Sequence, residues 1–572
     1  MERRTFLKIL SSAGIVSLVS PTFAMEVCKN KVSKSSSALL ESAFRNPPFS
    51  SGVYTWWHWM NGNITKDGIT RDLEAMKANG IAGYQLFEAG SVIPIGPVES
   101  LSDEWVDLIL HTLKESERLG LEFAMHNCPG WSSSGGPWIT PDKAMQIITW
   151  SETKITGGKQ VRIQLPTPKH MFDYYIDTYC LAIPANMKVI PRLSILELSN
   201  RLVLTWDVPT GEWLIMRFGQ TAKDQKNKSA PSKSTGLDCD KFSTEALDYH
   251  LNCMFKRLMP TMEKIAKHSK IGLLIDSYET GDQDWTSDMP AYFEQSHGYE
   301  LYPFLPVLAN KIVESEESTK RFLFDFRRVR ADMFAERYYG HFQKRCKEKG
   351  IITYTEPYGG NMMEELQVAQ QLDINMGEFW CGQTVLWANY KYNRTVKQVA
   401  SIAHTLGGKV VGAEAFTSEP DADKWLQYPY ALKSLGDYMF TRGLSRIYFH
   451  RFAHQPHPTA APGMTMGAWG LHFDRTNTWW KPGKAWIEYL NRCQYIFQSS
   501  TFYGDILYHN GDDSFGSTIE PEQTLLAPPE GYDYDMVNTE MLDKAHIKDG
   551  KILFPATRFD GYKLLVLLKS ET

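Results

Sequence analysis

The sequence lacks a C-x-x-C pair, a phosphate-binding loop and a large excess of charge of either sign. Its eight cysteines are scattered along 572 residues, so neither a zinc ribbon nor a redox motif is indicated. A chain of this length needs no disulfide framework, and we expect no essential disulfide. The Gly-Gly pairs at 135–136, 359–360 and 407–408 are typical of turns. The net charge of −5 predicts no basic surface for nucleic acid.

Long apolar runs are missing as well, except for a short one at the N-terminus. Residues 1–24, MERRTFLKILSSAGIVSLVSPTFA, combine a charged start, an apolar stretch and small residues at the end. The apolar stretch is too short to span a bilayer. The Arg3-Arg4 pair predicts a twin-arginine export signal, with a general secretory signal as the alternative. Either signal predicts a periplasmic or secreted protein without a membrane span.

Aromatic residues, in contrast, are abundant. They make up 13% of the chain, with 17 Trp and 27 Tyr. Flat aromatic faces are common in carbohydrate clefts, although most aromatic side chains belong to the core. The rest of the composition is ordinary for a globular protein, and the length predicts two to four domains.

Residues 51–500 alternate between short apolar runs and amphipathic helical segments. Eight runs begin near residues 53, 81, 121, 271, 351, 372, 409 and 445. Eight such units are the number in a (β/α)₈ TIM-like barrel, an α/β fold with a parallel sheet. The sequence therefore predicts this barrel as the catalytic domain.

Other segments depart from this alternation. Residues 143–235 carry strand patterns and turn signals, including a predicted hairpin around residues 209–211, and indicate a small inserted β domain. Its polar last part, residues 223–236, predicts a mobile loop. Residues 25–50 form a lead-in. Residues 501–572 predict the start of a C-terminal α/β domain, with too few layers to bury its faces unless it packs against the rest or is truncated.

Carboxylates end four consecutive predicted barrel strands, at Glu279, Glu356, Glu378 and Glu414. The active site of such barrels lies at the carboxyl ends of the strands. Glycoside hydrolysis needs one protonated acid for the leaving oxygen and one carboxylate as base or nucleophile, and crowded negative charges raise at least one carboxyl pKa. One such glutamate is more often an ion-pair partner or a helix cap, but four at consecutive strands favour a glycosidase.

The remaining strand ends supply aromatic, imidazole and amide groups that suit sugar binding. We expect substrate contacts from Trp57, His58, Trp59, Asn61, His126, Trp131, Tyr278, Glu356, His450 and His454. A metal site at His450, His454 and His457 is the alternative for the last group. Pro456 and Pro458 interrupt any helical spacing there, so hydrogen bonding to substrate is favoured.

Five stretches at these strand ends are long enough for comparison with known families. They are WWHWMNGNITKDGITRDLEAMKANGIAGYQLFEAG, HNCPGWSSSGGPWI, GLLIDSYETGDQDWT, VVGAEAFTS, and FHRFAHQPH followed by PGMTMGAWGLHFDRTNTWW. Together they resemble the bacterial α-L-rhamnosidases of glycoside hydrolase family 106, from about residue 50 to the end. The resemblance implies an exported hydrolase that removes terminal α-L-rhamnose with inversion. Members are usually longer, which implies a truncated C-terminal domain here.

The resemblance also implies individual roles. Glu279 in DSYE and Glu414 in AEAF match the family's catalytic pair, with Glu279 as base and Glu414 as acid. An inverting pair stands roughly 6.5–9.5 Å apart. The family implies calcium, Ca2+, that meets the vicinal hydroxyls of the sugar, with Glu378 as candidate ligand. The expected substrates are pectic or other rhamnosylated oligosaccharides and polysaccharides. The alternatives are a truncated carbohydrate-binding protein without turnover, or a barrel glycosidase for another sugar.

Overall fold

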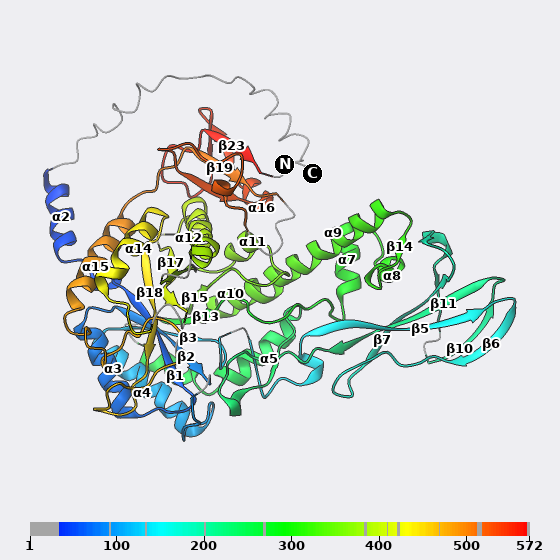
Figure 1. The fold of residues 1–572 in the computed structure, drawn as a ribbon, viewed down its shortest axis with the longest axis horizontal. Coiled ribbons are helices and arrows are strands. Elements are labelled where there is room, and N and C mark those ends of the chain that lie inside the picture. The colour runs from blue at the N-terminus through cyan, green and yellow to red at the C-terminus, as the bar shows by residue number, and fades with distance from the viewer. Residues whose placement is uncertain are drawn as a thin grey trace.

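The computed structural model describes most of the chain from residue 34 to residue 568 (Figure 1). The residues outside this description are 1–33, 91–92, 132–133, 200–201, 267–269, 383–385, 409, 420–423, 468, 512–517 and 569–572. The predicted export signal lies outside the described residues. Within them, no helix combines the length and apolar character that crossing a membrane would require. All seven cysteines of the described part are free thiols.

Eight parallel strands close into a barrel, and they follow one another around it in chain order. The strands are β1 (Tyr54–Met60), β2 (Gly83–Ala89), β3 (Glu122–His126), β13 (Ile271–Ile275), β15 (Ile352–Thr355), β16 (Ile374–Cys381), β17 (Gly412–Ser418) and β18 (Arg446–Ala453). Pairing of β18 with β1 closes the ring. Each strand lies within a few residues of its predicted start, so the (β/α)₈ prediction is confirmed.

Helices surround this barrel (Figure 1). They include α3 (Lys66–Ala78), α4 (Asp103–Leu119), α5 (Thr244–Phe255), α9 (Glu316–Met333), α10 (His341–Lys347), α11 (Glu365–Ala369), α12 (Leu386–Leu406), α14 (Pro429–Thr441) and α15 (Lys484–Ser499). Helix α3 shows how the sequence determines where a helix begins and which face it buries. The side chain of Thr65 accepts a hydrogen bond from the backbone of Gly68 and caps α3. Ile69, Leu73 and Met76, spaced to share one face, are fully buried in the core.

Successive side chains of each barrel strand point alternately into the barrel and toward the surrounding helices, so there are two separate hydrophobic cores. The barrel interior holds Tyr54, Tyr354 and Tyr448, with 5.1 Å between the ring centroids of Tyr54 and Tyr448. Trp57 belongs instead to the larger core cluster, which includes residues of the surrounding helices. Because side chains alternate along a strand, Trp56 shares the inner face with Tyr54. This alternation decides which predicted site residues can reach the barrel mouth.

The β insertion extends to one side of the barrel (Figure 1). Its main strands are β5 (Gln146–Thr156), β6 (Lys159–Gln164), β7 (Ile176–Pro184), β10 (Val203–Val208) and β11 (Glu212–Ala222). The prediction of a hairpin around residues 209–211 is wrong, because β10 pairs with β6 while β11 pairs with β5 and β7. The turns at Gly157 and Gly211 meet instead, with the amide of Gly157 donating to the carbonyl of Gly211 at 2.7 Å. The long strands β5 and β11 thus pair with each other and leave β6 and β10 to form a second ribbon.

The segment that returns from the insertion to the barrel, residues 223–236, is irregular in structure and makes specific contacts, and its mobility stays a prediction. The side-chain amide of Asn227 donates to the carbonyls of Pro129 and Ser234 at 2.9 and 3.1 Å. Its carbonyl oxygen accepts from the backbone of Gly236 at 2.8 Å. Asn227 of this segment therefore satisfies three backbone groups.

The last unit holds a parallel sheet in the order β20–β19–β23. Its elements are β19 (Ile506–His509), β20 (Tyr534–Val537), α16 (Thr539–Leu542) and β23 (Leu564–Leu567). The strand β20 is followed directly by the short helix α16. Leu507 and Val537 pack with Leu366 of α11 and Ile402 of α12. The sheet therefore buries one face against the barrel helices.

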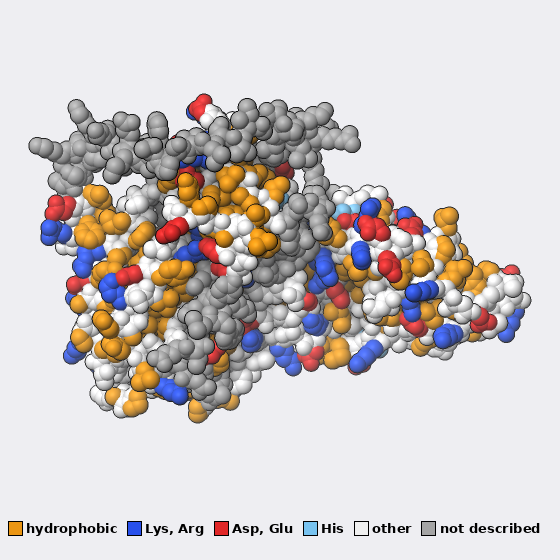
Figure 2. All heavy atoms as spheres, turned by 45° about the horizontal axis from the view of Figure 1, so that its top comes forward, with side chains coloured by type: hydrophobic (Ala, Val, Ile, Leu, Met, Phe, Trp, Pro, Cys, Tyr) orange, Lys and Arg blue, Asp and Glu red, His pale blue; other side chains and the backbone are white. Residues whose placement is uncertain are grey.

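Charges are mixed on the face of the molecule shown in Figure 2. Acidic and basic side chains are interspersed over the projecting β insertion, and no continuous basic patch is visible on that face.

Candidate active site

A cavity of about 820 Å³ opens at the carboxyl ends of the barrel strands. This volume is within the usual range for small-molecule sites. Its lining includes Trp56, His58, Trp131, Lys228, Asp276, Ser277, Glu279, Tyr358, Glu378, Trp380, Arg394, Glu414, Thr417, His450, Met466 and Trp469. Carboxylates, imidazoles and indoles therefore meet in one space, where parallel barrels carry their chemistry.

Glu414 is the buried carboxyl of this cavity. It lies on β17, in register with Glu378 of β16. The hydroxyl of Thr417 donates to Oε1 of Glu414, and Nδ1 of His450 lies 3.5 Å from the same oxygen. Burial raises the pKa of Glu414 well above its usual value, and the neighbouring Glu378 and Asp276 raise it further. This environment favours the protonated form of the carboxyl.

Glu279 has the opposite environment. It lies four residues beyond the end of β13, and its side chain is 39% exposed. Oε2 of Glu279 is ion-paired with Lys228 and lies 3.4 Å from the indole nitrogen of Trp131. The hydroxyl of Ser277 is 3.4 Å from the other oxygen. A solvated, cation-paired carboxylate and a buried carboxyl in one cavity are the arrangement in which two acids take different roles.

A second pair of acids is buried close to the floor of the cavity. Burial raises the pKa values of both Asp276 and Glu356 well above their usual range, and Asp276 adds to the effect on Glu356. The hydroxyl of Tyr358 donates to Oε2 of Glu356 at 2.6 Å. Two adjacent buried carboxyls of this kind hold at least one proton at neutral pH. Of the two, Asp276 also raises the pKa of Glu414.

Three buried histidines lie on the inner side of the strands near this cavity. Burial lowers the pKa of His58 and His450 well below the usual value and that of His126 to about 4. The rings of His58 and His450 meet edge to face at 5.6 Å. Within the described part of the chain, Nδ1 of His58 and Nε2 of His126 have no hydrogen-bond partner. Of the three, His58 and His450 line the cavity, where neutral imidazoles can exchange hydrogen bonds with sugar hydroxyls.

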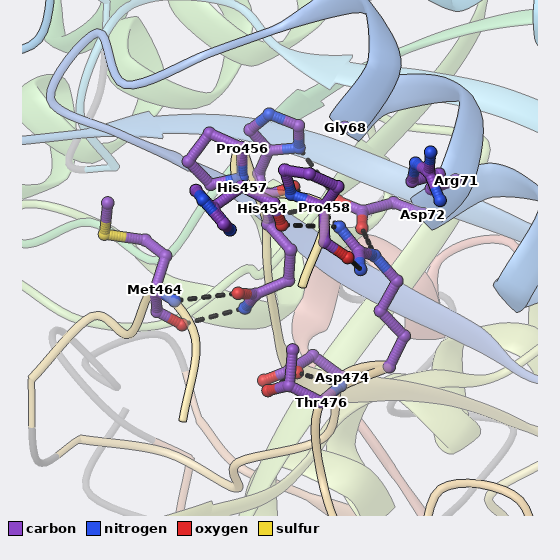
Figure 3. A network of polar contacts seen from close by, with 12 residues as sticks. Gly68, Arg71, Asp72, His454, Pro456, His457, Pro458, Met464, Asp474 and Thr476 are labelled. Carbon is purple, nitrogen blue, oxygen red and sulfur yellow. Dashed lines mark hydrogen bonds and ion pairs between the residues drawn. The ribbon is translucent and has the colours of Figure 1, made fainter. Parts of the chain in front are cut away.

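Several predicted substrate contacts lie elsewhere, and one group surrounds Asp72 of α3. Nδ1 of His454 lies 2.8 Å from the Asp72 carboxylate, and the guanidinium of Arg475 donates to it at 2.7 Å (Figure 3). The indole of Trp57 donates to the same carboxylate at 3.2 Å. Trp59 packs against Trp57 at 5.6 Å between ring centroids. Placing Trp57, Trp59 and His454 at the substrate is therefore corrected, because their side chains point toward the helices.

Asn61 and Tyr278 are also held by the protein rather than presented to the cavity. The side chain of Asn61 donates to the carbonyl of Ile93 at 2.6 Å, where its positive φ of 47° turns the chain. The hydroxyl of Tyr278 donates to the carbonyl of Gly281 at 2.9 Å, and its ring meets Phe334 edge to face. Both side chains therefore stabilise loops next to the cavity and are not positioned to contact a substrate.

Other lining residues were missed at the level of sequence. Trp56 could be found from strand alternation, because a pattern that points His58 inward also points Trp56 inward. Lys228 and Trp469 reach the cavity from segments outside the barrel strands. Their positions depend on tertiary packing, and no local pattern indicates them.

Glu378, the candidate calcium ligand, does line the cavity. Its Oε1 accepts a hydrogen bond from the indole of Trp380. Among the described residues, no three His, Cys, Asp or Glu side chains converge in a way that would hold a metal ion. Calcium takes six to eight oxygen ligands.

Three comparisons place this architecture among known proteins. The family model of glycoside hydrolase family 106, described as alpha-L-rhamnosidase, matches residues 45–177 and 169–572. The solved rhamnosidase of Novosphingobium sp. PP1Y superimposes with a TM-score of 0.82 at 23% identity, over 92% of this chain and 67% of that one. A protein of Formosa agariphila named "Putative beta-glucuronidase" is 39% identical over 93% of this chain.

The chain spans about half of that curated relative, 47% of its length. The family match covers the barrel, the β insertion and the last unit alike. The motifs noted in the sequence lie at the barrel mouth, where the cavity and its acids are found. The chain therefore belongs to glycoside hydrolase family 106, the α-L-rhamnosidase family, and carries a (β/α)₈ barrel.

Proposed function

We propose that the protein releases terminal α-L-rhamnose from glycans with inversion of the anomeric centre. The observation that carries the proposal is the contrast between Glu414 and Glu279 in one cavity. The first is buried with a raised pKa, and the second is partly exposed and ion-paired with Lys228. An acid and a base with separate environments are what a two-carboxylate hydrolysis requires.

In this mechanism Glu414 donates its proton to the glycosidic oxygen as the bond to the anomeric carbon breaks. The leaving alcohol departs neutral. Glu279 accepts a proton from a water molecule that attacks the anomeric carbon from the opposite face. Glu279 follows β13 and Glu414 lies on β17, with β15 and β16 between these strands around the barrel. Inversion is the part of the proposal that the resemblance to the family supplies.

A neutral terminal sugar suits this cavity better than a uronic acid. The lining carries the acids Asp276, Glu279, Glu378 and Glu414. Its two lysine or arginine side chains among the described residues are already paired, Lys228 with Glu279 and Arg394 with Glu365. A glucuronate carboxylate would find both of these cations already engaged by carboxylates of the protein. The name of the Formosa agariphila relative nevertheless makes β-glucuronide the second candidate substrate.

The proposal includes a calcium ion, for which Glu378 is the one protein ligand that we assign. Its carboxylate would supply one hard oxygen ligand, and sugar hydroxyls and water would have to supply most of the others. When bound, such an ion would orient the vicinal hydroxyls of the sugar. The acid and base steps above use only Glu414 and Glu279.

A panel of nitrophenyl glycosides tests the proposal directly. The expected result is hydrolysis of the α-L-rhamnoside, with the β anomer as the first product in a proton NMR time course. Preference for the β-D-glucuronide would replace the sugar assignment. The α anomer as first product would overturn inversion, and binding without product on all substrates would favour the carbohydrate-binding alternative.

A further inference from the structure

We propose that Lys228 is a positioning residue that holds the carboxylate of Glu279 in its working orientation, and that the β insertion thereby completes the active site. The inference rests on the proposed base role of Glu279. Lys228 lies in the segment that returns from β11 to the barrel, and no barrel strand carries it. The insertion therefore takes part in the chemistry besides projecting from the barrel.

The contacts on Glu279 are concentrated on one oxygen. Nζ of Lys228 is ion-paired with Oε2, and the indole nitrogen of Trp131 lies 3.4 Å from the same atom. Two donors on Oε2 fix the plane of the carboxylate, while Oε1 accepts one long hydrogen bond, from the Ser277 hydroxyl at 3.4 Å, and retains a lone pair for the water molecule. Lys228 is 50% exposed at its side chain, so the pair forms at the open side of the cavity. Orientation of a reacting group is worth far more here than the small stability of an exposed ion pair.

The backbone around Lys228 is seated on the ends of two barrel strands. The amide of Gly90, just after β2, donates to the carbonyl of Ser229 at 2.7 Å. The amide of Trp131, after β3, donates to the carbonyl of Lys228 at 3.3 Å. These bonds fix the lysine backbone relative to the barrel, so the side chain starts from a defined place.

Two glycines make this close approach possible. A Cβ atom at Gly130 would lie 2.3 Å from the carbonyl oxygen of Lys228, and Gly130 has a φ of +90°. A Cβ atom at Gly90 would lie 2.5 Å from the carbonyl oxygen of Ala230. Non-bonded atoms do not approach this closely. In both cases the clashing atom belongs to the backbone, which cannot move aside as a flexible side chain could. The barrel therefore accommodates the returning segment only because these positions lack side chains.

The test is a double-mutant cycle on the full chain. Lys228→Met, Glu279→Gln and the double variant are assayed with excess enzyme on a nitrophenyl α-L-rhamnoside, in single turnover. Lys233→Met is the matched control, because Lys233 belongs to the same segment, is 57% exposed and pairs with Glu99 at 3.0 Å. Unfolding temperatures of all variants establish that each is folded.

We expect Lys228→Met to slow the chemical step by roughly ten- to a hundredfold, with less change in KM, while Lys233→Met stays near wild type. In the Glu279→Gln background the same lysine change should have little further effect, because its target is already lost. Equal losses in both backgrounds, or an unchanged rate in Lys228→Met, would overturn the positioning role. If wild type cleaves another glycoside instead of the rhamnoside, the sugar assignment fails alone, and the cycle is run on that glycoside.

Discussion

Nδ1 of His450 lies 3.5 Å from Oε1 of Glu414, and both side chains are buried. Burial lowers the pKa of the imidazole, with Arg451 lowering it further, and raises the pKa of the carboxyl. Both shifts favour the uncharged forms, so this pair is a neutral imidazole beside a protonated acid rather than an ion pair. A proton is therefore available at Glu414 for a leaving group.

The first prediction concerns Glu414→Gln and the leaving group. The variant has no acidic proton at this position. Its kcat on an alkyl α-L-rhamnoside should therefore fall by at least about a hundredfold. It should lose much less on a dinitrophenyl rhamnoside, whose phenolate departs without protonation. Steady-state kcat on the two substrates measures this difference. Equal losses on both would remove Glu414 from the acid role.

The second prediction concerns Glu279→Gln, which should behave differently. Activation of water is needed whatever the leaving group, so the loss of about a hundredfold or more should be similar on both substrates. The comparison with Glu414→Gln is the control, since both changes replace a carboxyl by an amide at the barrel mouth. Full activity of Glu279→Gln would contradict the two-carboxylate assignment.

Strand order and strand ends were predictable because the apolar runs and helices repeat in sequence. Alternation then limits which neighbours share a face, and the prediction for Trp57 and Trp59 failed on this point. His58 faces the cavity, whereas Trp57 on the same strand donates to Asp72 of α3. Counting from His58 would have identified Trp56 instead.

Contacts between distant segments were beyond the reach of sequence patterns. His454 was predicted at the substrate because it follows the last barrel strand, but the carboxylate of Asp72, 382 positions away, binds its ring. Lys228 comes from a polar stretch that resembles a loop in composition. Its place beside Glu279 depends on the close packing of its backbone against Gly90 and Gly130, and this packing is evident only from the three-dimensional structure.

The third prediction separates the two neighbouring tryptophans of β1. Trp57→Phe removes the indole donor from buried Asp72 and should cost about 1–3 kcal/mol of unfolding free energy, with kcat/KM within a few-fold of wild type. Trp56→Phe should alter kcat/KM more than stability, because Trp56 lines the cavity beside His450. Denaturant unfolding and kinetics are measured on both variants. A large kinetic loss in Trp57→Phe at unchanged stability would return Trp57 to the substrate.

The fourth prediction concerns calcium. If an ion at Glu378 orients the sugar, a strong chelator should lower kcat/KM of wild type by about tenfold or more, and added calcium should restore it. Without any treatment, Glu378→Gln should already have the low kcat/KM of chelated wild type. Neither the chelator nor added calcium should change it. Isothermal titration of the chelated protein with calcium, in the presence of rhamnose, gives a readout independent of turnover. Indifference of wild type to the chelator would remove the metal from the proposal.

The fifth prediction concerns stability and pH at Glu88, which is buried behind the mouth of the barrel and accepts a hydrogen bond from Ser100 at 2.5 Å. Burial raises the pKa of Glu88 from 4.5 to about 7. The unfolded chain ionises first as pH rises, so the stability associated with this group is fully present below about pH 4.5 and is lost as pH rises through about 7.

Glu88→Gln removes this titration, so the variant should lose less stability than wild type between pH 5 and pH 8. The difference should be on the order of 3 kcal/mol. Unfolding free energies at the two pH values measure it, with Glu104→Gln as control because Glu104 is exposed nearby on α4. If wild type and Glu88→Gln lose the same stability over this range, Glu88 is already ionised in the folded protein at pH 5, and burial at this position does not retain its proton.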